Sequence, residues 1–173
     1  MKLNKLLEVL MYCIPAIITG FVSFYFFKIH TSSEEKKMKI ALLKEQKKHT
    51  LPIQLQAYER MTLFLERINP SKLLIRINSV NNDKTAYTQS LINTIEQEFE
   101  HNIAQQIYIS DKCWNVIIAS KNATTHIIKK TSDLESVKTA QELREAVLKR
   151  ILETSAPSTT ALAFIKSEVH DLL

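Results

Sequence analysis

The pattern in this sequence with the clearest chemical potential is Glu98-x-x-His101, which places a carboxylate and an imidazole one helical turn apart. Helical bundles that hold two metal ions use two such pairs, together with a Glu from each of two other helices. Glu59 and Glu66 could supply those carboxylates, but the chain holds a single Glu-x-x-His. On a helical projection, His101 also points away from the apolar positions of its segment. We therefore expect no metal and no cofactor, and a metal-dependent enzyme around these residues is the less favoured alternative.

Nucleophilic chemistry has equally little support. Cys113 and His126 are thirteen residues apart, and no third group is indicated that would orient them. A small, apolar cysteine is the more common role. The single glycine, Gly20, lies in an apolar run, so a glycine-rich phosphate loop is excluded. We expect no catalytic residues and a chain that is not an enzyme.

The dominant element of the chain is an uncharged run of nineteen residues from Val9 to Phe27. As a helix it would extend about 29 Å at ~1.5 Å per residue, which matches the hydrocarbon core of a bilayer. It is longer than the apolar stretch of a signal peptide, and no small-residue cleavage site follows it. We therefore predict a retained single-pass membrane span that includes Pro15 and Gly20, with its aromatic end at Phe27.

The excess positive charge lies next to this run. Residues 1–50 hold nine lysines and four glutamates, whereas residues 51–173 hold fourteen basic and fourteen acidic side chains. A nucleic-acid-binding surface would place the excess on the folded domain, so we expect no nucleic-acid partner. The positive-inside rule instead predicts that the C-terminal domain is cytoplasmic. The predicted lipid-facing basic cluster is Lys28, Lys36, Lys37, Lys39, Lys44, Lys47 and Lys48.

Two features of the N-terminal part leave alternatives open. The segment that carries most of these lysines fits either a solvated stalk helix or a helix that lies on anionic lipid. Ala16 and Gly20 form a pair of small residues four positions apart, which permits homo-oligomerisation without requiring it.

Composition and periodicity predict an all-α fold, with an N-terminal transmembrane helix and stalk followed by a small helical bundle. One glycine and four prolines are too few for a sheet protein with its turns. Apolar spacing and capping residues predict helices over 53–68, 84–107, 111–131, 139–153 and 159–171. The expected helix starts include Asp83 as a cap, Ser110 as a cap, and a capping box formed by Thr139 and Glu142. We expect a helix break at Thr50–Pro52, and residues 72–77 could be helical or extended. The predicted domains are a membrane anchor (1–30), a basic stalk (31–50) and a cytoplasmic helical domain (51–173).

The helix expected over 84–107 has a defined apolar face. Ile103 and Ile107 continue the stripe that begins at Leu91, and Asn102 and Gln106 fall on the same half of the helix. These two amides either fix how a neighbouring helix docks or form a polar edge.

Several short stretches resemble the hallmarks of a known family. Residues 56–60 (QAYER) and 64–68 (FLERI) are similar to one hallmark; residues 98–102 (EFEHN) and 105–108 (QQIY), with Trp114, are similar to a second. Together with the apolar run they resemble an uncharacterised bacterial family of small single-pass inner-membrane proteins. The resemblance implies a bacterial inner-membrane location and no catalytic or binding site.

These features favour a membrane-tethered helical module that binds an unidentified protein partner at the inner face of the membrane. The alternative is a module that binds the lipid surface through the basic stalk. Aromatic residues dominate the energetics of protein interfaces. The candidate partner contacts are Tyr58, Asn102, Gln106, Tyr108 and Trp114.

Overall fold

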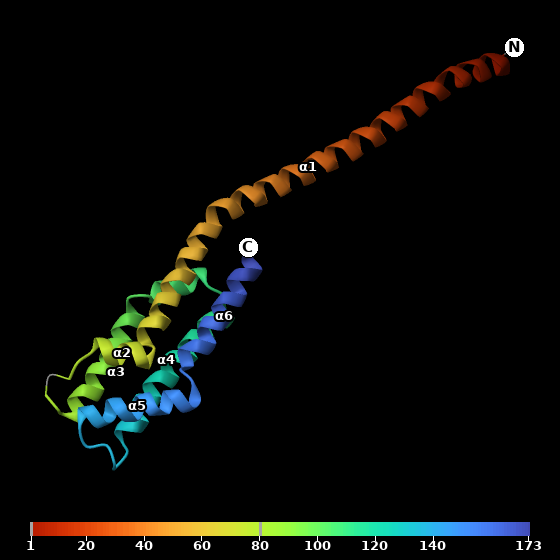
Figure 1. The fold of residues 1–173 in the computed structure, drawn as a ribbon. Coiled ribbons are helices and arrows are strands. Elements are labelled where there is room, and N and C mark those ends of the chain that lie inside the picture. Colours follow the sequence, from red (N-terminus) through yellow and green to blue (C-terminus); the bar gives the residue numbers. More distant parts are fainter. Residues whose placement is uncertain (1, 80) are drawn as a thin grey trace. The chain divides into compact units, whose positions relative to one another are not determined.

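The chain is described from a computed structural model that places every residue except Met1 and Val80, with the backbone alone for residues 2–10, 12, 32 and 33. The elements are α1 (Lys2–Ile68), α2 (Pro70–Arg76), α3 (Lys84–Glu100), the 3-10 helix η1 (Ile103–Tyr108), α4 (Asp111–Ser132), α5 (Ala140–Thr154) and α6 (Pro157–Leu172) (Figure 1). Extended pairing among the described residues is limited to an isolated bridge between Asp83 and Thr139. The predicted all-α class is confirmed.

Internal contacts divide the chain into two units, Met1–Thr50 and Leu51–Leu173, and α1 runs through both. In the first unit every described side chain is exposed, including those of Pro15 and Phe27, whereas the side chain of Val9 lies outside the described residues. Apart from the adjoining residues and the local helix backbone, no heavy atom of the described residues lies within 4 Å of the position that a Cβ at Gly20 would occupy. Homo-oligomerisation through this position therefore stays a prediction, because packing within the single chain does not require the glycine.

The described part of α1 from Cys13 onward contains a window long and apolar enough to cross a membrane, with a mean hydropathy of 1.4 and no residue buried. It is the one such helix among the described residues. The predicted break at Thr50–Pro52 is wrong, because α1 continues to Ile68. Lys48 is exposed, so water can reach the carbonyl that loses its donor at Pro52.

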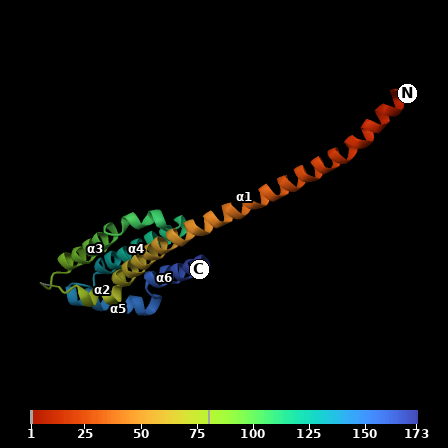
Figure 2. The same ribbon diagram turned by 90° about the horizontal axis from the view of Figure 1, so that it is seen from above.

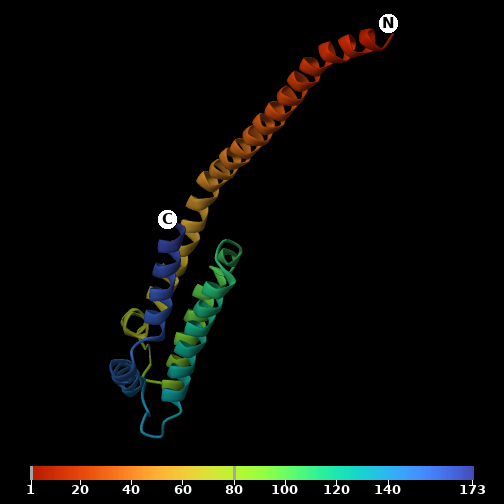
Figure 3. The same cartoon turned by 90° about the vertical axis from the view of Figure 1, so that its right-hand side faces the viewer.

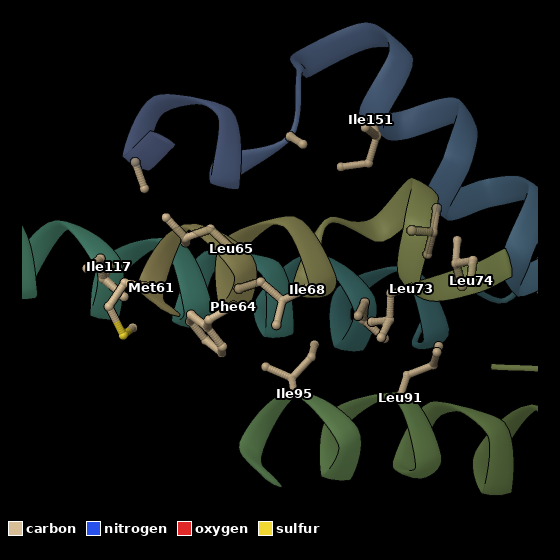
Figure 4. Packing of buried hydrophobic residues seen from close by; sticks show 14 of the residues in the cluster. Met61, Phe64, Leu65, Ile68, Leu73, Leu74, Leu91, Ile95, Ile117 and Ile151 are labelled. Carbon is tan, nitrogen blue, oxygen red and sulfur yellow. The ribbon is translucent and has the colours of Figure 1, made fainter. Parts of the chain in front are cut away.

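The second unit, which we call the helical domain (Leu51–Leu173), forms a single apolar core. α4 packs against α3, α5 and α6, and α5 also contacts α2 and α3 (Figures 2 and 3). The last turns of α1 supply the centre of this core (Figure 4). The largest fully buried side chains are Met61, Phe64, Leu65, Ile68, Leu73, Leu74, Leu91, Ile95, Ile117, Ile128, Leu143 and Val147.

The helix starts follow the predicted caps. Asp83 accepts a hydrogen bond from the Thr85 N–H at 2.8 Å, and Ser110 accepts one from the Cys113 N–H at 3.1 Å. Thr139 and Glu142 form the predicted capping box. The segment that could be helical or extended is helical: α2 begins after Asn69, whose side chain accepts from the Ser71 N–H.

The predicted helix over 84–107 is too long. α3 ends at Glu100, and the chain continues as η1, which has a tighter repeat of about three residues per turn. Apolar positions projected at 100° per residue therefore lose their register with the core. As a result Ile103 is 47% exposed and Ile107 is 72% exposed, rather than buried as predicted.

The end of α5 carries backbone strain. Ser155 has φ 63° and ψ 159°, a region in which glycine is favoured, and its side chain is exposed. We expect Ser155→Gly to raise the free energy of unfolding by about 1 kcal/mol, because strain relief exceeds the entropy that glycine adds to the unfolded chain. Urea unfolding followed by the fluorescence of Trp114, the single tryptophan, measures this. Ser155→Ala is the control, and a glycine variant no more stable than the alanine variant would contradict the expectation.

Candidate functional site

Residues of the two hallmark stretches line one groove of about 630 Å³ on the helical domain. α1 contributes one stripe of side chains spaced three or four residues apart, so they share a face of the helix. α3 contributes a second stripe by the same spacing. The lining residues are Gln56, Glu59, Arg60, Leu63, Phe64 and Arg67 from α1, with Thr94, Gln97, Glu98 and His101 from α3 and the adjoining Asn102.

Opposite stripes of the same helix segments have different roles. Ala57, Met61 and Leu65 are completely buried in the core on one side of α1. On the groove side, Arg60 and Arg67 are exposed and Leu63 is 54% exposed. The core therefore explains the apolar stripe of α1, but it does not explain the charged stripe or the exposed leucine within it.

Glu98 is the electrostatic centre of the groove. Arg67 Nη1 donates to Glu98 Oε2 at 3.0 Å and to Oε1 at 3.2 Å, and Arg76 Nη1 is 3.2 Å from Oε1. The Glu98 side chain is 19% exposed, so two guanidinium groups compensate a carboxylate that is largely shielded from water. Charge-assisted pairs of this kind are stronger and more directional than neutral hydrogen bonds.

This arrangement does not assemble the metal set of the alternative hypothesis. Glu98 is already paired with two arginines, and Glu66 lies outside the groove with its carboxylate paired with Lys72. Exposed His101 directs Nδ1 to the Gln97 carbonyl oxygen at 2.7 Å. No group of three His, Cys, Asp or Glu side chains that could hold a metal occurs among the residues the structure describes.

An aromatic stack lies between α3 and α4. The Phe99 ring is 5.4 Å from the Trp114 ring and 5.7 Å from the Phe64 ring, measured between centroids. Lys121 Nζ lies 4.8 Å from the Phe99 centroid and 2.6 Å from Glu96 Oε2. Lys121 is therefore ion-paired as well as extended along apolar surface. Trp114 is half-buried in this stack, which limits the area that it could offer to a partner.

Tyr58 was predicted to contact a partner, but the structure buries its side chain. It is 4% exposed, and its hydroxyl donates to Glu168 Oε2 on α6 at 3.1 Å. The other Glu168 oxygen accepts from Ser110 Oγ, and buried Cys113 lies near enough for the Glu168 charge to act on its thiol. Glu168, the centre of this cluster, is not among the residues predicted from the sequence. Its position three residues after Ile165, on the apolar side of α6, is the signal that could have indicated it.

The cluster shifts two pKa values. Burial raises the pKa of Tyr58 to about 12, a rise that the Ser110 backbone hydrogen bond opposes and the Glu168 charge reinforces. Burial likewise raises the pKa of the Cys113 thiol to about 12, with Glu168 adding to the effect. The structure therefore favours the protonated, neutral form of both groups, and Cys113 is not a nucleophilic thiolate at neutral pH.

These shifts predict a loss of stability in alkali. In the folded chain the pKa of Tyr58 lies above its ordinary value of 10.0, and the pKa of Cys113 lies above its ordinary value of 9.0. The protonated forms therefore stabilise the fold. This contribution is complete below pH 9 and is lost as the pH rises toward 12. Relative to Tyr58→Phe, we expect the wild-type chain to lose about 2 kcal/mol of unfolding free energy between these limits. Urea titrations at several pH values measure it. Exposed Tyr108→Phe is the control, and parallel profiles for wild type and Tyr58→Phe would contradict the prediction.

Of the remaining predicted contacts, Asn102 lines the groove, whereas Gln106 and Tyr108 are not among its lining residues. Asn102 is half-buried, and its Nδ2 donates to the Glu98 carbonyl oxygen at 2.8 Å. Gln106 is exposed, and Tyr108 is 39% exposed. These side chains are accessible in the domain, as a contact with another chain requires.

The chain is thus an all-helical protein with a long N-terminal helix that meets the length and hydropathy of a membrane span, and with a helical domain that carries a charged surface groove. Comparison with known families matches residues 4–172 to the family of unknown function DUF7935, and the chain belongs to this family. Comparisons with curated proteins and with solved structures found no match. The predicted membership in a family of unknown function is confirmed.

Proposed function

We propose that this protein is a membrane-tethered interaction module. Residues 1–30 would anchor it in a bacterial inner membrane, residues 31–50 would serve as a basic stalk, and the helical domain would bind a protein partner in the cytoplasm. The support for the anchor is the apolar part of α1, and the support for its orientation is the lysine excess that follows it.

The observation that carries the binding role is the groove between α1 and α3. It combines exposed guanidinium groups, side-chain amides and exposed Leu63 on a surface that the core does not require. Protein interfaces combine apolar contacts with hydrogen-bonding groups, and this groove presents both on one concave surface. The carboxylate with the most shielded position, Glu98, is neutralised by two arginines, which suits binding better than proton transfer. We therefore propose a binding module rather than an enzyme.

The test is purification of the tagged full-length protein in a mild detergent, followed by identification of chains that accompany it in stoichiometric amounts. We expect a partner with wild type and not with Leu63→Glu, because a charge in the groove opposes desolvation. Leu152→Glu is the matched control, since Leu152 is 88% exposed on α5. Trp114 fluorescence verifies that each variant is folded. Absence of a partner, or equal loss in both variants, would reject the proposal.

A second candidate function is binding of anionic lipid by the basic cluster. Its seven lysines are all exposed, and Lys37 has an ion pair, with Glu34 at 3.0 Å. A synthetic peptide of residues 28–50 should become helical with vesicles that contain phosphatidylglycerol and not with phosphatidylcholine vesicles. Equal response to both vesicles would eliminate this function.

A further inference from the structure

We propose that the groove between α1 and α3 binds an acidic peptide segment of the partner, with Arg60 pairing a partner carboxylate. This inference rests on the proposed function and specifies the chemistry of the ligand. The occupant is a segment of another protein, held by one side chain with a carboxylate and one apolar side chain that contacts Leu63.

The charges around the groove favour an acidic ligand. Two guanidinium groups, those of Arg60 and Arg67, and two carboxylates, those of Glu59 and Glu98, line the groove. Arg76 lies outside this lining and adds a third guanidinium group at Glu98. Glu98 uses Nη1 of Arg67 and Nη1 of Arg76, which leaves further N–H donors on both exposed guanidinium groups. The groove therefore retains donor capacity for a carboxylate from another molecule.

Arg60 is the least committed of these cations. It is exposed, and its side chain forms no hydrogen bond and no ion pair with the residues that the structure describes. Glu59, the neighbouring acid, also lines a second hollow of about 320 Å³ that Lys166 of α6 borders, so it lies at the shared edge of two surfaces. A guanidinium without an internal partner is well suited to a carboxylate from another molecule, which it can bind through two parallel hydrogen bonds.

The other lining groups favour a peptide rather than a lipid headgroup or a nucleic acid. Gln56 and Gln97 carry side-chain amides that can both donate to and accept from a peptide backbone. Leu63, 54% exposed, offers an apolar contact next to them. A phosphate-rich ligand would call for a wider basic surface, whereas residues 51–173 carry equal numbers of basic and acidic side chains.

Glu98 acts as a positioning residue in this site. Its carboxylate holds the Arg67 guanidinium group against the groove wall, and Arg76 pairs with the same carboxylate from outside the lining. The remaining donors of Arg67 are thereby held in place instead of moving freely in solvent. Arg60 lies on the same stripe of α1 as Leu63, three positions earlier, so one ligand segment can contact both.

The test is photo-cross-linking of the full-length protein in cell membranes, with a photoreactive phenylalanine derivative at position 63 and, as a control, at position 152. The cross-linked peptide is sequenced by mass spectrometry. We expect position 63 to capture a segment of another protein that contains Asp or Glu, and position 152 not to capture it. Arg60→Gln should lower the yield about tenfold, since a charge-assisted pair is lost. Lys149→Gln, an exposed change on α5, should leave the yield unchanged.

A synthetic copy of the captured segment gives the direct measurement. Its affinity for the detergent-solubilised full-length protein should fall about tenfold when its acidic residue is replaced by the matching amide. This loss should disappear in Arg60→Gln. A segment without Asp or Glu, or one insensitive to Arg60→Gln, would overturn the acidic ligand and leave the interaction module standing. Cross-links to lipid, to a second copy of this chain or to nothing would overturn both.

Discussion

Replacement of Phe64 by alanine is expected to lower the free energy of unfolding of the helical domain by about 3–5 kcal/mol. Phe64 is 1% exposed in the core, where it lies between Met61 and Ile68 of α1 and faces Ile95 of α3 (Figure 4). Its removal leaves a cavity that surrounding helices cannot fill without moving. The same change removes the ring that lies 5.7 Å from Phe99.

Urea unfolding of the full-length protein in detergent, followed by Trp114 fluorescence, measures this loss. Trp114 stacks on Phe99, so a rearrangement of Phe99 should also shift the emission of the folded state to longer wavelength. Phe27→Ala is the matched control, because Phe27 is 73% exposed in the first unit and contributes nothing to the core of the domain. A loss below about 1.5 kcal/mol for Phe64→Ala would mean that the site is less tightly packed than the structure shows.

The second large effect is expected for Glu168→Ala, with a loss of about 2–4 kcal/mol. One carboxylate accepts hydrogen bonds from Tyr58 on α1 and from Ser110 at the start of α4. Tyr58 is buried, so its hydroxyl finds no water as a substitute when the carboxylate is removed. A buried donor that is left without an acceptor costs more free energy than its hydrogen bond contributes to stability.

Glu168→Gln separates the loss of hydrogen bonds from the loss of side-chain volume. The amide keeps one acceptor oxygen and the shape of the side chain, so we expect a smaller loss than for alanine. Glu135→Ala is the control, because Glu135 is exposed in the loop between α4 and α5. The cluster would have no role in attaching α6 if Glu168→Ala and Glu135→Ala gave the same urea midpoint. The alkaline titrations of wild type and Tyr58→Phe test the same cluster independently.

Local features of the chain were predictable because the groups that form them are neighbours in sequence. Asp83, Ser110 and Thr139 accept hydrogen bonds from backbone N–H groups two or three residues later, so capping residues mark helix starts without knowledge of the fold. The scarcity of glycine and the 3.6-residue apolar spacing indicate an all-α chain for the same reason. The apolar run from Val9 to Phe27 is likewise a property of contiguous residues.

Other features were decided by residues far apart in the chain. Tyrosine is a residue type that is common at interfaces, but Tyr58 is buried and its hydroxyl donates to Glu168, 110 positions away. Ile103 and Ile107 continue an apolar stripe in projection, yet α3 ends at Glu100 and they become exposed. Sequence spacing cannot report either outcome, because each depends on where the chain turns and what packs against it.

The candidate site shows the same division. From the sequence alone, Arg60 and Arg67 belong to the solvated side of one helix, and Glu98 belongs to the solvated side of another. Each stripe follows from helical periodicity, which is local. Only the packing of α1 against α3 places the stripes along one groove and brings Arg67 to 3.0 Å from the Glu98 carboxylate. Local sequence was sufficient for the all-α class, for most helix starts and for the apolar N-terminal run, but not for the continuity of α1 across Pro52 or for where α3 ends. The tertiary structure decided which faces meet, because contacts between distant segments depend on how the whole core packs.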